Sequence, residues 1–116
     1  MARAKTASPI ASPFQGRWKI VESDVWDDEA LNLVEDAYIE FEGESGEMRF
    51  IAVVAHLDVR YDVRNGSPVA DFSWDGFDDD EPRSGRGWVA IGTAGRLVGH
   101  IHFHLGDDSG FVCERM

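Results

Sequence analysis

The stretch that decides the fold runs from residue 57 to residue 64 and reads LDVRYDVR. Apolar residues take every second position, so they share one face of a strand while the charged residues share the other. The apolar, core-facing set is Leu57, Val59, Tyr61 and Val63. Asn65-Gly66 follows directly and is typical of a type I′ turn, in which both central residues have a positive φ. The pattern predicts an antiparallel hairpin between residues 57–64 and 69–75.

The same alternation recurs along most of the chain, with turn residues between the runs. The further strands are expected over residues 16–26, 37–42, 47–54, 86–92, 96–105 and 110–115. Asp27 is expected to cap a short helix over residues 30–34. Residues 76–85 are rich in acidic residues, Gly, Pro and Ser, which predicts a long loop.

About eight short antiparallel strands in chain order, with one short helix after the first strand, predict an all-β protein. An up-and-down barrel is favoured because closure removes exposed strand edges, and a β-sandwich is the alternative. A barrel of this size is filled by side chains or holds one small ligand. Four Trp and seven Phe favour a mostly filled interior.

Length and composition limit the classes of protein to which the chain can belong. Its 116 residues suffice for one domain, and 43% hydrophobic with 11% aromatic residues is typical of a globular core. A net charge of −11 repels a phosphate backbone, so no nucleic-acid partner is expected. No apolar run predicts a membrane span or a signal peptide. We expect a flexible tail over residues 1–13 and a single domain over residues 14–116.

Cys113 is the only cysteine, which excludes an intramolecular disulfide and favours a reducing, cytoplasmic location. It alternates with Val112 in the last predicted strand, where a packed and unreactive thiol is expected. The composition leaves both a monomer and a homodimer open.

Two resemblances to known families bear on these expectations. The segment FQGRWKIVES, residues 14–23, resembles the opening strand of the calycins, the lipocalins and fatty-acid-binding proteins, which carry an F-x-G-x-W pattern. That resemblance implies that Trp18 plugs one end of a barrel and that Arg115, in the last strand, packs across it.

The segments FSWDG (72–76), SGRGW (84–88) and GDDSGF (106–111) are similar to a family of small uncharacterised bacterial proteins. This second resemblance implies a bacterial cytoplasmic setting and no particular activity.

Three histidines form the sharpest candidate site in the sequence. His100, His102 and His104 alternate with apolar residues, which places the imidazoles on one strand face about 6.6 Å apart. Two of them can chelate one metal, but a third ligand has to come from a neighbouring strand, such as His56 or an acid. The alternative interpretation is a solvated polar face opposite a core face that includes Leu105.

The sequence as a whole is most typical of a non-enzymatic binding protein without a cofactor. Its expected partner is a small apolar ligand or another protein. The candidate lining of a ligand site is Trp18, Tyr61, Phe72, Trp74 and Trp88, with Arg115 as a closing residue. One alternative is a metal-dependent enzyme or metal-binding protein that uses the His100, His102 and His104 face. Another is an acidic interaction protein that docks on a basic partner.

Overall fold

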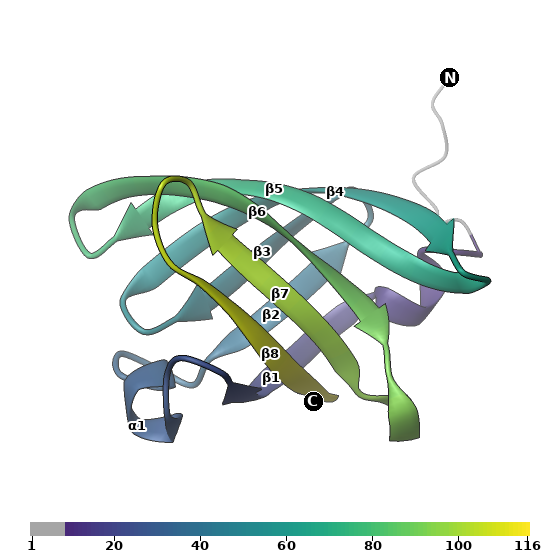
Figure 1. Ribbon diagram of the computed structural model, residues 1–116, viewed down its shortest axis with the longest axis horizontal. Coiled ribbons are helices and arrows are strands. Elements are labelled where there is room, and N and C mark those ends of the chain that lie inside the picture. Colours follow the sequence, from purple (N-terminus) through teal and green to yellow (C-terminus); the bar gives the residue numbers. More distant parts are fainter. Residues whose placement is uncertain (1–8) are drawn as a thin grey trace.

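The computed structural model describes residues 9–116 and is a closed barrel of eight antiparallel strands in chain order (Figure 1). The first strand pairs with the last, which confirms the predicted up-and-down barrel. The strands are β1 (Gly16–Ser23), β2 (Tyr38–Glu42), β3 (Ser45–Phe50), β4 (Val53–Arg64), β5 (Ser67–Asp78), β6 (Glu81–Ile91), β7 (Leu97–Phe103) and β8 (Asp108–Arg115). The helices are η1 (Ser12–Phe14), α1 (Asp28–Leu31) and η2 (Thr93–Gly95).

The β4–β5 hairpin forms as its alternation predicts. Asn65 and Gly66 have φ values of 52° and 79°, so both adopt the left-handed conformation of a type I′ turn. Leu57 and Val59 are buried in the core. Val63, predicted to join them, is 47% exposed, because it lies beside the turn, beyond the packed part of the sheet.

The prediction of a long acidic loop over residues 76–85 is wrong. β5 continues to Asp78 and β6 begins at Glu81, so only Asp79 and Asp80 turn the chain. The glycines serve the packing of the sheet, because a Cβ on Gly76 would lie 1.8 Å from the Val54 carbonyl oxygen. A Cβ on Gly85 would meet the His102 carbonyl oxygen at the same distance. A composition typical of loops is therefore used here in a strand pair.

Several element boundaries also differ from the predicted ones. β1 ends at Ser23, and the capping aspartate Asp27 starts a helix that ends at Leu31. The Asp27 carboxylate accepts a 2.9 Å hydrogen bond from the Ala30 backbone N–H, as its role in capping predicts. β7 ends at Phe103, so Leu105, expected in the core, is 95% exposed.

The predicted tail begins to pack before residue 13. Residues 1–8 lie outside the described part of the chain, but Ala11 is buried and Ser12 opens η1. η1 brings Phe14 into the core, where its ring lies 6.2 Å from Phe41 and 5.8 Å from Tyr61. The domain therefore includes at least residues 11–13.

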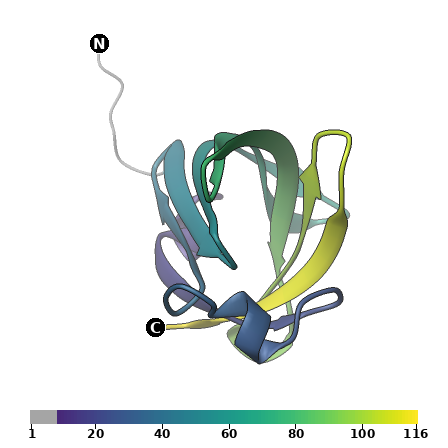
Figure 2. The ribbon, with the colours of Figure 1, turned by 90° about the vertical axis from the view of Figure 1, so that its left-hand side faces the viewer.

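Aromatic side chains close the interior towards both ends of β1. Trp18 and Phe14 lie near its start, whereas Trp26 lies beyond its end, close to Phe50 and Phe103 at 5.5 and 6.1 Å between ring centroids. α1 lies at this second end, which faces the viewer in Figure 2. A cavity of about 10 Å³ beside Trp26 has room for no more than one water molecule.

Candidate functional site

The predicted apolar ligand lining does not surround a ligand-sized cavity in the described interior. Trp18, Phe72 and Trp74 are 2–4% exposed and belong to one packed core. Trp88 is half-buried, and it lies on the outer side of β6 because its neighbours Gly87 and Val89 are buried. The interior residues therefore serve stability, and Trp88 cannot line the interior.

Arg115 packs across the Trp18 ring, a contact that the calycin resemblance implies. Its guanidinium lies 3.9 Å from the centroid of the Trp18 ring, and the two residues are paired in the β1–β8 register. The guanidinium also donates hydrogen bonds to the backbone carbonyls of Gln15 and Pro13. Trp18 in turn donates from its indole N–H to the Phe14 carbonyl at 2.9 Å. Through these contacts Arg115 holds η1 against the barrel.

The Tyr61 hydroxyl likewise makes structural hydrogen bonds. It donates to the Gly43 carbonyl and accepts a 2.9 Å hydrogen bond from the Gln15 side-chain amide. Burial raises the pKa of Tyr61 above its ordinary value, so the phenol stays protonated at neutral pH.

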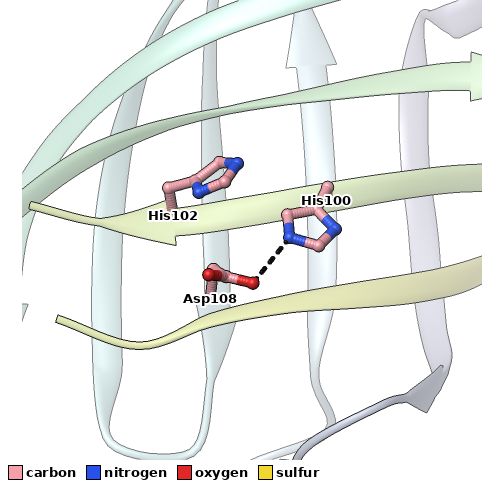
Figure 3. A group of neighbouring side chains, drawn as sticks. All are labelled: His100, His102 and Asp108. Carbon is pink, nitrogen blue, oxygen red and sulfur yellow. Dashed lines mark hydrogen bonds and ion pairs between the residues drawn. The ribbon is translucent and has the colours of Figure 1, made fainter.

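The outer face of β7 and β8 brings a different group together. His100 and His102 project from β7, and Asp108 starts β8 directly opposite His102 (Figure 3). Nε2 of His100 lies 2.9 Å from Oδ1 of Asp108, and the two imidazole centroids are 4.7 Å apart. One ligand atom from each of the three residues lies within 4.8 Å of the other two.

Two imidazoles and a carboxylate are a ligand set that suits a divalent transition metal. In a tetrahedral site, ligand atoms about 2.0–2.2 Å from one ion lie roughly 3.3–3.6 Å apart. Side-chain rotation has to bring the three groups closer than the 4.8 Å within which they now lie, and these side chains are half-buried or exposed. Three protein ligands also leave coordination positions open for water or another molecule.

His104 and His56 do not join this group. His104 follows the end of β7, and with His56 it lines a groove of about 560 Å³ on the outside of the sheet. The sequence pattern places His100 and His102 on one strand face and predicts that the third ligand, His56 or an acid, comes from a neighbouring strand. It did not identify Asp108, because the β7–β8 register decides which acid of the turn faces His102.

A larger groove of about 760 Å³ crosses the outside of β4, β5 and β6. Most of its charged and polar lining comes from outward positions of these strands, and Phe72 and Trp74 reach its floor beside Gly85 and Gly87, which have no side chains. The polar members are Asp58, Arg60, Arg64, Asp71, Ser73, Ser84, Arg86 and His104. This groove provides the volume for a small molecule that the described interior lacks.

No helix among residues 9–116 has the length and apolar character needed to cross a membrane. The chain has no significant match among the family models, the curated proteins or the solved structures with which it was compared.

Proposed function

We propose that this chain is a metal-binding protein that holds a divalent transition-metal ion through His100, His102 and Asp108. The observation that carries the proposal is the convergence of three ligand atoms, from two hydrogen-bonded strands, within 4.8 Å. The ion takes the place of the present contact between His100 and Asp108. The negative net charge of the protein adds a general attraction for cations.

The strand pairing supports the proposal because it fixes the backbone positions of the three residues before the metal arrives. His100 pairs with Gly110 and His102 with Asp108, so the β7–β8 ladder sets the spacing of the three residues. Gly110 is held further by a 3.1 Å hydrogen bond from its N–H to the Asp24 carboxylate. Little backbone ordering then remains to oppose binding.

An apolar ligand inside the barrel is less well supported, because the interior cavity beside Trp26 holds about 10 Å³. Binding of a protein partner stays a prediction of the sequence. It is compatible with a metal site on the outer face.

Thermal unfolding with and without Zn²⁺ tests the proposal. At a hundredfold excess over Kd, binding to the native state alone adds about 2.7 kcal/mol, which raises Tm by roughly 10 °C in a domain of this size. EDTA is expected to remove the increment. An unchanged Tm with Zn²⁺, Co²⁺ and Ni²⁺ alike would overturn the proposal.

Two double variants make the test specific. His100→Ala/His102→Ala is expected to lose the Zn²⁺-dependent increase in Tm, because two of the three ligands are gone. His56→Ala/His104→Ala removes the same number of imidazoles from the groove and is expected to keep the increase. Equal behaviour of the two variants would show that the histidines bind the ion non-specifically.

A further inference from the structure

A row of outward side chains leads from the proposed metal ligands into the larger groove. In the sheet register Ser73 of β5 pairs with Arg86 of β6, Arg86 pairs with His102 of β7, and His102 pairs with Asp108 of β8. Directly opposed residues in an antiparallel pair have Cβ atoms about 4.5–5.5 Å apart. The side chain of Arg86 is therefore the neighbour of the proposed metal ligand His102 on the side that faces the groove.

Arg86 differs from the other arginines of residues 9–116 in having no partner. The paired arginines are Arg17 with Glu40, Arg49 with Glu35 and Glu47, Arg60 with Asp58, Arg64 with Asp71, Arg83 with Glu81, and Arg96 with Glu114. Arg115 is held by Trp18 and two carbonyls. Arg86 is exposed and makes no such contact, although the protein carries a net charge of −11.

The surroundings of Arg86 leave room for a ligand on its guanidinium. Its outward neighbour on one side along β6 is the small Ser84, and both residues line the groove of about 760 Å³. Arg60 and Arg64, on the same groove, are already neutralised by Asp58 and Asp71. The positive charge still available in this groove is therefore that of Arg86.

We infer that Arg86 binds a small oxyanion, a carboxylate or a phosphate, that also occupies an open coordination position of the metal ion. A guanidinium presents paired N–H donors that match the two oxygens of such a group. The metal supplies a second positive charge beside it. This inference rests on the proposed metal site and names the class of ligand that completes it.

The test uses Co²⁺, whose visible absorption changes when its coordination changes. The Co²⁺-loaded protein is titrated with acetate and, separately, with inorganic phosphate, and the spectrum reports anion binding. Arg86→Gln is expected to bind Co²⁺ as the wild type does and to bind the anion about tenfold more weakly, through loss of a charge-assisted hydrogen bond. Whichever anion binds more tightly identifies the carboxylate or the phosphate as the ligand.

Arg83→Gln is the matched control, because it removes the same charge from the same strand but from an arginine already paired with Glu81. It is expected to keep the anion affinity of the wild type. Equal anion affinities of Arg86→Gln and the wild type would overturn the inference and leave the metal site standing. Failure of the wild type to bind Co²⁺ would overturn both.

Discussion

Trp18 shows how one residue joins three parts of the molecule. Its ring is 2% exposed, its indole N–H donates to η1, and its face carries the Arg115 guanidinium from β8. The calycin resemblance of residues 14–23 implies that Arg115 packs across this residue, and the two are opposite each other in the β1–β8 register. Removal of the side chain would leave a cavity and an arginine without its aromatic partner.

Trp18→Ala is therefore expected to lower the free energy of unfolding by about 3–5 kcal/mol, the usual range for truncation of a buried aromatic residue. Chemical denaturation of the wild type and the variant measures the difference. Trp88→Ala, which truncates a half-buried tryptophan on the outer face, is the control and is expected to cost clearly less. A loss below about 1 kcal/mol for Trp18→Ala would contradict its role.

Cys113 illustrates a residue whose environment removes its chemistry. Its side chain is fully buried, and burial raises the pKa of the thiol above its ordinary value. The thiolate, which is the reactive form, is therefore suppressed at neutral pH. This environment matches the packed, unreactive thiol expected from its alternation with Val112.

Among the elements, the β4–β5 hairpin was predictable because its signals are local. Alternation fixes which face is buried, and the Asn65-Gly66 dipeptide fixes the turn. The β5–β6 hairpin was not predictable in the same way. Its Gly and acidic residues occupy strands whose outer face is solvated, and only the three-dimensional contacts show why Gly85 leaves no space for a Cβ.

The turn residue Gly66 offers a test of the hairpin. Gly66→Val is expected to destabilise the protein by about 1–2 kcal/mol, because a β-branched residue resists the φ of 79°. A Cβ at Gly66 meets no atom within 4 Å, so the loss reports backbone strain and not a clash. Gly66→Asn, which tolerates this conformation, is expected to cost less in the same denaturation experiment. Equal stabilities of all three proteins would contradict the type I′ turn.

The candidate site was predictable to the same extent as its strands. A period of two is enough to place His100 and His102 together on one face of β7. The identity of the third ligand depends on the register between β7 and β8, and the connection over residues 104–107 sets that register. Sequence alone does not distinguish Asp107 from Asp108 as the partner of His102.

For the whole molecule, the sequence predicts least well how completely side chains fill the barrel interior. Many aromatic residues favoured a packed interior, but the size of the remaining space depends on how the rings meet. Trp26, Phe50 and Phe103 close one end with centroids 5.5–6.1 Å apart. Their positions in the chain give no sign of this contact, because they belong to different strands and connections.

The segment over residues 9–13 contacts the rest of the barrel through the buried Ala11 and the Pro13 carbonyl. A chain that begins at residue 14 is expected to melt at a lower temperature than one that begins at residue 9. Removal of residues 9–13 exposes the site now covered by Ala11 and deletes the Pro13 carbonyl that accepts from Arg115. Calorimetry of the two truncated proteins measures the difference. Identical melting temperatures would show that these contacts contribute nothing to stability.

The pairing of β1 with β8 has a consequence for the order in which the protein can form during synthesis. Arg115 contacts the Gln15 carbonyl across a separation of 100 residues. At translation rates of about 5–20 residues per second, roughly 5–20 s pass between the synthesis of β1 and that of β8, the second strand that pairs with it. One edge of β1 is therefore unpaired on the ribosome throughout that interval, and protection from intermolecular strand pairing begins only after the final strand has been made.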